Sequence, residues 1–277
     1  MIGDVYMKLT YLGTAAAEGF PAVFCNCKYC IEARKLKGKN IRTRSQSLVN
    51  DDLLIDIPPD TYMHFLQNNI EAHKIKYLII THSHSDHFYY DELKMRHSPF
   101  AHDMSNQTLE IFCSQSVYNI FQKNGIHENT KVTLISPYEK LNFGDYTITG
   151  LPARHMNENE ALIYIIQSDK TILYAHDTGY FYDEVFEYIK NNNIKLDMIS
   201  LDCTHVNTSV SDQNKHMGLE NTQRLVYRLS KIGAVSNKSL IYINHFSHNA
   251  NPLHHLLENM VEDMGFKVSY DGLTVEI

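Results

Sequence analysis

The sequence predicts an α/β fold in which β-sheets are covered by helices and form one layered domain over residues 1–277. Short runs rich in Ile, Leu, Val and Tyr alternate with segments of helical apolar spacing, which is typical of layered sheets and helices. The chain has 277 residues with 43% hydrophobic content, enough for one sizeable core. It contains no short-period repeat, low-complexity tract or linker that would divide it.

The individual strands and helices follow from these patterns. Strands are expected where short apolar runs occur, at 8–13, 45–49, 52–57, 76–80, 109–113, 131–135, 146–153, 161–167, 171–177, 196–202 and 239–245. One helical segment opens on Asp60 after two prolines, and another begins at Ser114 and ends at Gly125. Helices are expected at 60–69, 114–125, 183–192, 218–233 and 251–265.

The charge balance and the N-terminal residues exclude some function classes. Lys and Arg number 25 and Asp and Glu number 32, a formal net charge of −7. We therefore expect no large nucleic-acid partner, because phosphate neutralisation needs clustered cations. No apolar run reaches the roughly 18 residues of a membrane span, and "MIGDVYMKLT" lacks the basic start and apolar stretch of a signal peptide. The expected location is the cytoplasm, without a membrane partner.

The stretch "THSHSDHF" (81–88) places four potential metal ligands directly after the apolar run "KYLII". His82 and His84 would point the same way in extended geometry, because the strand period is two, and Asp86 and His87 follow on the next turn. Imidazole and carboxylate suit first-row cations such as zinc, manganese and iron. The alternative is a solvated histidine-rich loop, which this number of ligand types at a strand end disfavours.

His-x-His-x-Asp-His after an apolar strand resembles the signature of the metallo-β-lactamase fold. That resemblance implies an αβ/βα sandwich of two mixed sheets covered by helices. It also implies later single ligands at strand ends, and "LPARHMN", "YAHDTGY" and "INHFSHN" supply candidates in order. Two divalent ions (Zn or Mn, with Fe a further option) would be held by His82, His84 and His155 on one side and by Asp86, His87 and His245 on the other, with Asp177 bridging.

The stretch "CNCKYC" predicts a second, structural metal site in an N-terminal loop near 19–45. A structural zinc needs four closed ligands, so three thiolates need one more. The histidine three residues after His245 can face this loop, which gives a Cys₃His zinc site of Cys25, Cys27, Cys30 and His248. The alternative is three reduced surface thiols. The isolated Cys113 and Cys203 are interpreted as small buried residues in strands.

Taken with "RTRSQSLV", "LDCTH" and "NKHMGLE", these stretches resemble the PhnP family of phosphodiesterases of bacterial phosphonate breakdown. The resemblance runs from about residue 8 to the C-terminus, and the PqqB proteins share the pattern more loosely. The first motif, "GTAAAEG", carries alanines where the family usually has more glycines, a change that affects the pocket floor rather than the metal ligands. The resemblance implies hydrolysis of small cyclic phosphodiesters (phosphoribosyl or ribonucleoside cyclic phosphates) by a metal-bridged hydroxide, and a homodimer.

The resemblance also implies catalytic groups in the late loops. His216 would donate a proton to the leaving oxygen and Asp202 would orient it, with His205 as a further contributor. Arg42 and Arg44 are candidates for contacting a substrate phosphate, with a solvated basic turn as the alternative. The remaining histidines without motif support are expected to be surface or helix residues: His64, His73, His97, His102, His127, His254 and His255.

Two other interpretations stay open from the sequence. The same ligand set suits hydrolysis of a lactam, lactone or thioester on this fold, because fold does not determine function. Two-metal lactamases of this fold usually lack the Asp177-type bridge and the His216 donor, which favours phosphoesters. A PqqB-like relative without catalytic activity could instead carry a small ligand. A tRNA endonuclease is disfavoured, since the sequence shows no long basic inserted arm.

Overall fold

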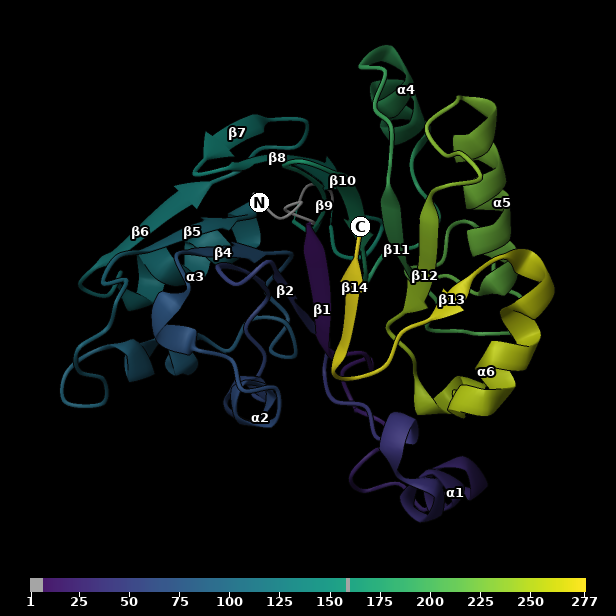
Figure 1. The fold of residues 1–277 in the computed structure, drawn as a ribbon, viewed down its shortest axis with the longest axis horizontal. Coiled ribbons are helices and arrows are strands. Elements are labelled where there is room, and N and C mark those ends of the chain that lie inside the picture. Colours follow the sequence, from purple (N-terminus) through teal and green to yellow (C-terminus); the bar gives the residue numbers. More distant parts are fainter. Residues whose placement is uncertain (1–6, 158–159) are drawn as a thin grey trace, which may run out of the picture.

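The structure is a computed structural model, and it describes residues 7–157 and 160–277. Two seven-stranded sheets pack against each other, and helices cover their outer faces (Figure 1). The predicted α/β arrangement of two mixed sheets covered by helices is confirmed. The expectation of no signal peptide concerned the N-terminal segment, and residues 1–6 of that segment lie outside the described range.

The first sheet combines segments from both ends of the chain. In spatial order its strands are β14 (Leu273–Glu276), β1 (Lys8–Gly13), β2 (Gln46–Val49), β3 (Leu53–Ile55), β4 (Tyr77–Ile80), β5 (Leu109–Cys113) and β6 (Thr130–Leu134). β1 pairs antiparallel with β14 and β2, and Leu9 lies opposite Val275. From β3 to β6 the strands are parallel, so their carboxyl ends meet at one edge.

The second sheet has the same mixed character. In spatial order its strands are β13 (Lys267–Val268), β12 (Leu240–Asn244), β11 (Met198–Asp202), β10 (Thr171–Ala175), β9 (Leu162–Gln167), β8 (Tyr146–Pro152) and β7 (Lys140–Phe143). β10 to β13 are parallel, whereas β7 to β10 are antiparallel. The loops after parallel strands β10, β11 and β12 therefore begin at one edge of this sheet.

The helices lie outside the two sheets. α2 and α3 cover the first sheet, and α4, α5 and α6 cover the second (Figure 1). The α-helices are α1 (Lys28–Leu36), α2 (Thr61–Gln67), α3 (Gln115–Asn124), α4 (Asp183–Asn191), α5 (Leu219–Lys231) and α6 (His254–Val261). Shorter 3₁₀ turns are η1 (Gly38–Asn40), η2 (Ala72–Lys74), η3 (Tyr90–Arg96), η4 (His248–Ala250) and η5 (Glu262–Met264). Within the described ranges, no helix has the length and apolar character needed to cross a bilayer.

Buried apolar side chains fill the space between these layers. Tyr11 and Tyr164 lie in the cluster between the two sheets and are fully buried. Phe121 of α3 belongs to a cluster on the outer face of the first sheet, and Phe186 and Leu225 belong to one on the outer face of the second. Four layers packed through three apolar interfaces hold the strand ends, and the loops that follow them, in fixed positions.

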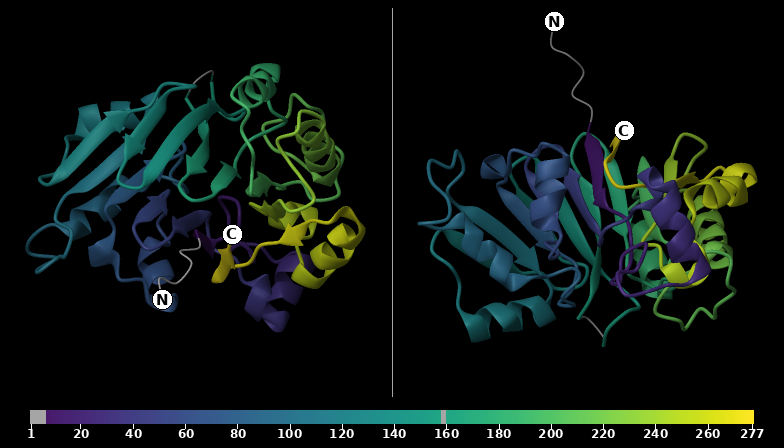
Figure 2. Two further views of the ribbon diagram at one scale, coloured as in Figure 1. Left: turned by 45° about the horizontal axis from the view of Figure 1, so that its top comes forward. Right: turned by 90° about the horizontal axis from the view of Figure 1, so that it is seen from below.

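The structure contains every strand and helix that the sequence predicts, within a few residues at each end. It adds β7, β13 and β14, which are too short or too polar to stand out as apolar runs. The prediction of a loop across 19–45 is wrong in part, because α1 begins at Lys28 inside it. Cys30 and Ala33 form the buried face of α1 and pack against Leu253, which places α1 beside α6 (Figure 2).

Candidate active site and candidate zinc centre

The predicted ligands of the paired site all follow the carboxyl ends of strands. His82 and His84 follow β4, and Asp177 and His245 follow β10 and β12. His155 follows β8 on the second sheet. Because the two sheets face each other, these loops converge at one edge of the sandwich, and residues far apart in sequence become neighbours.

The first predicted ligand group gathers around Asp177. His82, His84, His155 and Asp177 each offer one ligand atom, and these atoms all lie within 4.8 Å of one another. His84 Nδ1 lies 3.0 Å from both His82 Nε2 and His155 Nε2. Asp177 Oδ2 is 3.1 Å from His82 Nε2, and Asp177 Oδ1 is 3.2 Å from His155 Nδ1.

The second predicted group gathers on the same carboxylate. The ligand atoms of Asp86, His87, His245 and Asp177 also lie within 4.8 Å of one another. His87 Nε2 is 3.1 Å from Asp177 Oδ2 and 3.5 Å from Asp86 Oδ2, and His245 Nε2 is 3.9 Å from Asp177 Oδ2. Asp177 is thus common to both groups, as a bridging ligand must be.

The nitrogen and oxygen atoms at the site are better arranged as ligands for divalent cations than as hydrogen-bonding pairs. Among the described residues, no partner in hydrogen-bond geometry meets four buried atoms, which are His87 Nε2, His155 Nδ1, His245 Nε2 and Asp177 Oδ1. Burial lowers the pKa of His82 to about 3 and that of His155 to about 4, so these imidazoles are neutral and can bind metal. Burial would raise the pKa of Asp177, but His245 and the other histidines hold it well below its usual value. This buried set implies divalent-metal binding, and the assignment of each ligand to an ion stays a prediction.

Hydrogen bonds from neighbouring strands orient the imidazoles. Asp56 Oδ2 lies 2.7 Å from His87 Nδ1, and Thr81 Oγ1 lies 3.0 Å from His82 Nδ1. Thr81 also donates its backbone N–H and its hydroxyl to Asp56. With Nδ1 occupied, each imidazole presents Nε2 to the site. Asp56 was not predicted as a site residue, although its position near the end of the predicted strand "DLLIDI" was a usable signal.

Three of the aspartates and histidines at the site have left-handed backbone conformations. The φ angles are 63° at Asp56, 55° at Asp177 and 62° at His245. Such conformations are uncommon outside glycine and persist where the surroundings impose them. Their concentration at this edge shows that the loops are held tightly after the strands end.

The predicted catalytic pair lies beside Asp177. His216 Nδ1 is 3.1 Å from Asp202 Oδ2 and 3.1 Å from Asp177 Oδ1, so its Nε2 is free to face outward. The His216 side chain is 23% exposed, whereas Asp202 is fully buried. Burial would lower the pKa of His216, but Asp202 and Asp177 raise it to about 9. His205 is more remote, with its ring centroid 6.0 Å from that of His216.

These same residues form a further ligand group. Ligand atoms of Asp177, Asp202, His216 and His245 lie within 4.8 Å of one another. Thr204 Oγ1 lies 2.8 Å from His245 Nδ1 and also contacts Asp202 Oδ2 at 3.2 Å. Asp202 thus supports His216 directly and His245 through Thr204.

Gly179 sets the distance between the Asp177 loop and the His216 loop. An added Cβ at Gly179 would lie 1.9 Å from the carbonyl oxygen of Asn214. This distance is far too short for a non-bonded contact, so the position accepts no side chain unless the backbone moves. Asn214 Oδ1 accepts the backbone N–H of His216 at 3.0 Å, so a shift of Asn214 moves His216.

Gly179→Ala is therefore expected to lower kcat at least about tenfold, since small misplacements of a catalytic group are costly. The paired site should keep its metals. Kinetics and elemental analysis of the same preparation check this, with Gly265→Ala, where an added Cβ would meet nothing within 4 Å, as the control. Full activity in Gly179→Ala would contradict the packing argument.

The suggested phosphate contact from Arg42 is wrong, because its side chain is buried, and that from Arg44 stays a prediction. Arg42 is 2% exposed and donates to Thr14 Oγ1 and to the carbonyl oxygen of Ser269. Arg44 pairs with Asp60 at 3.1 Å. Both arginines therefore fasten loops to the body of the protein.

Two of the histidines assigned to helices or the surface are buried in helices. His64 lies 2.6 Å from both Gln46 Oε1 and Thr43 Oγ1, and His254 lies 2.9 Å from Arg42. The predicted burial of Cys113 and Cys203 is confirmed, with Cys113 ending β5 and Cys203 following β11.

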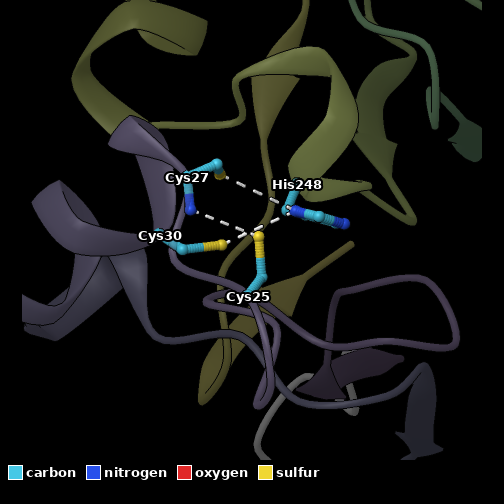
Figure 3. A group of neighbouring side chains, drawn as sticks. All are labelled: Cys25, Cys27, Cys30 and His248. Atoms are coloured by element: carbon cyan, nitrogen blue, oxygen red, sulfur yellow. Dashed lines mark hydrogen bonds between the residues drawn. The ribbon is translucent and has the colours of Figure 1, made fainter.

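The structure brings the predicted zinc ligands together (Figure 3). Ligand atoms of Cys25, Cys27, Cys30 and His248 lie within 4.8 Å of one another. His248 Nδ1 is 3.9 Å from Cys27 Sγ and 3.6 Å from Cys30 Sγ. The backbone N–H of Cys30, together with His248, lowers the pKa of Cys27 to about 6, which favours the thiolate that zinc requires. Three thiols and one imidazole fit a closed tetrahedral zinc site.

Solved structures share this architecture. A diphosphatase from the PhnP family has a TM-score of 0.75 and 21% identity, covering 98% of each chain. PqqB from Methylobacterium extorquens has a TM-score of 0.74 and 17% identity, covering 98% of this chain and 100% of that one. The metallo-β-lactamase fold protein YhfI from Bacillus subtilis has a TM-score of 0.70 and 20% identity, covering 98% and 99%. The TM-scores over nearly complete chains establish a common fold.

Sequence comparison gives the family. A UPF0173 protein of Pyrococcus abyssi is 27% identical over 128 residues, 46% of this chain, and the chain spans about half of that relative, 52% of its length. The Beta-lactamase superfamily domain matches residues 52–241, well over half of the 277 residues. The chain therefore belongs to the β-lactamase superfamily and has the metallo-β-lactamase fold.

Proposed function

We propose that this protein is a metal-dependent phosphodiesterase that hydrolyses small cyclic phosphodiesters, phosphoribosyl or ribonucleoside cyclic phosphates. The observation that carries the proposal is Asp177, whose carboxylate lies close to both groups of histidines while the partly exposed His216 stands beside it. This arrangement offers two cation positions and one protonated side chain within reach of a single reacting centre. Such an arrangement suits metal-assisted hydrolysis, in which a water-derived oxygen displaces the leaving group.

When bound, two divalent ions lower the pKa of water and stabilise negative charge on the phosphoryl oxygens. The ligands His82, His84 and His155, with Asp86, His87 and His245, would hold these ions around Asp177. Hydrolysis adds one water to phosphorus and breaks one ring P–O bond. His216 gives a proton to the departing oxygen, and Asp202 holds His216 through Nδ1 so that Nε2 faces the substrate.

Phosphoesters fit better than the alternatives because of this proton donor. A leaving alkoxide needs a proton, and His216 is fixed next to the bridging carboxylate by a buried partner. A thioester hydrolase does not require such a group to the same degree, since thiolates leave without one, whereas a lactone also releases an alkoxide and must be separated by assay. A carrier would have no use for a buried Asp202 that orients an exposed imidazole. Cleavage of a diphosphate bond remains a second candidate, since the fold is shared with a diphosphatase of the PhnP family.

Phosphorus NMR of a substrate mixture tests the proposal. The metal-loaded protein is incubated with phosphoribosyl 1,2-cyclic phosphate, 2′,3′-cyclic nucleotides, a diphosphate diester and a lactone. Regiospecific opening of one cyclic phosphate is the expected result. Cleavage of the diphosphate alone would assign the protein to the diphosphatases. Reaction of the lactone alone would contradict a phosphoesterase function.

His216→Asn should lower kcat for the cyclic phosphate by about 10²–10⁴-fold, the usual contribution of a positioned general acid. Bound metal should be unchanged, because the predicted ligand groups are complete without His216. The loss should shrink for substrates with a good leaving group, such as a nitrophenyl diester, and His255→Asn on the exposed face of α6 is the control. Equal losses for good and poor leaving groups would show that His216 is not the donor.

A further inference from the structure

The segment from His245 to His248 belongs to both candidate metal centres. His245 faces the paired site, and His248, three residues later, faces the cysteines. The backbone between them is fastened to the first loop of the chain, because Phe246 donates its N–H to Thr14 and accepts the N–H of Ala16, each at 3.0 Å. The two candidate centres are therefore joined by a short backbone segment that the first loop holds in place.

Glu18, in the same first loop, contacts this segment at two points. Its Oε1 accepts a hydrogen bond from Ser247 Oγ at 2.5 Å. The same oxygen lies 3.9 Å from His248 Nε2, within electrostatic range but beyond a hydrogen bond. Since His248 Nδ1 faces the cysteines, Nε2 is the outer nitrogen of this predicted zinc ligand. In the described part of the chain, the only basic nitrogen within 4.0 Å of this carboxylate is that of His248.

The other end of the segment is strained. His245 has a φ of 62°, and its carbonyl oxygen accepts the hydroxyl of Thr204 at 2.8 Å. A left-handed histidine needs fixed neighbours on both sides. Ser247, buried at 6% exposure, is the polar anchor on the C-terminal side, where its Oγ also accepts the N–H of Asn249.

We propose that Glu18 and Ser247 are positioning residues that couple the zinc centre to the paired site. Glu18 acts on the outer nitrogen of His248 by its charge and, through Ser247, holds the backbone that presents His245. Loss of a carboxylate hydrogen-bonded to the outer nitrogen of a ligating histidine typically costs about 10–100-fold in metal affinity, and at 3.9 Å we expect an effect at the low end of that range. The inference rests on the two metal centres of the proposed function, and its test reads metal binding, so it is independent of the substrate.

The two centres can be followed separately with two metals. Zinc at the thiolate site is measured by its release to a chromogenic chelator, and Mn²⁺, which thiolates bind poorly, reports the paired site through its electron paramagnetic resonance. Glu18→Gln should release zinc about tenfold faster and weaken Mn²⁺ binding by about tenfold. Ser247→Ala should weaken Mn²⁺ binding by a similar factor and leave zinc release within about twofold of wild type.

Glu32→Gln is the matched control, an acidic residue on α1 beside the cysteines whose contact, Lys35 at 3.8 Å, lies at the surface. It should change neither readout. Zinc release faster in Glu18→Gln with unchanged Mn²⁺ affinity would refute the coupling, as would a lower melting temperature with both metals bound as in wild type. A wild-type protein that binds no zinc at the cysteines overturns the inference, whereas absence of phosphodiesterase activity with both metals bound affects only the proposed function.

Discussion

Asp177→Ala is expected to abolish the paired metal site and to lower hydrolysis at least about 1,000-fold. Metal-assisted catalysis supplies several kcal/mol of barrier reduction, and each roughly 1.4 kcal/mol is a factor of ten in rate. Asp177 is the carboxylate common to both ligand groups, and it is 3% exposed. Its removal leaves several buried imidazoles without their shared negative charge, so both ions should be lost. Elemental analysis and kinetics on one preparation measure this.

The Asp177→Asn variant has a side chain of the same shape, so it separates the effect of losing the negative charge from the effect of changing the packing. It should keep the fold and the thiolate-site zinc while losing the paired ions, because an amide is a much weaker ligand than a bridging carboxylate. Asp169→Ala, at an exposed turn, should behave as wild type. Retained activity in a folded Asp177→Ala protein would exclude the paired site as the catalytic centre.

Cys27→Ala is expected to release one zinc and to lower the melting temperature by about 5–10 °C. Zinc at about 100 times its Kd stabilises the folded state by about 2.7 kcal/mol, and 1 kcal/mol shifts the melting temperature by about 2–4 °C at this size. Calorimetry with and without a chelator, and zinc analysis, check the result. The paired metals should remain largely bound, because their ligands are intact.

Cys113→Ala provides the comparison for this experiment. Cys113 is buried in β5 and distant from the other cysteines in sequence, so its loss should lower stability without changing zinc content. Chelator should then lower the melting temperature of Cys113→Ala more than that of Cys27→Ala, because only Cys113→Ala still has the thiolate-site zinc to lose. Unchanged zinc in Cys27→Ala would show that the four side chains do not form a metal site.

Much of the site was predictable because its residues follow apolar runs. The ends of strands are visible in the sequence, and His155, Asp177 and His245 each stand within three residues of one. The resemblance to the metallo-β-lactamase fold gave the grouping of these residues, and the structure explains it, because parallel strands bring their carboxyl ends to one edge.

The supporting contacts were not predictable in the same way. Asp56, Thr81 and Thr204 act through hydrogen bonds whose partners depend on the register of neighbouring strands. Arg42 looks like a surface residue in "RTRSQS", yet the structure buries it and satisfies it with a backbone carbonyl far along the chain. Propensity and spacing contain no information on such long-range pairings.

The pairing of β1 with β14 has a consequence for the order in which the chain folds. Lys8 lies opposite Glu276, a contact between residues almost the whole sequence apart. During synthesis on the ribosome, the outer edge of β1 stays uncovered until β14 has been made. A contact of such large sequence separation forms slowly and is sensitive to loop-closure entropy. Until the C-terminal strand emerges, the open edge of β1 is available to other strands, so nascent chains stalled before residue 273 should bind chaperones more strongly than the finished protein.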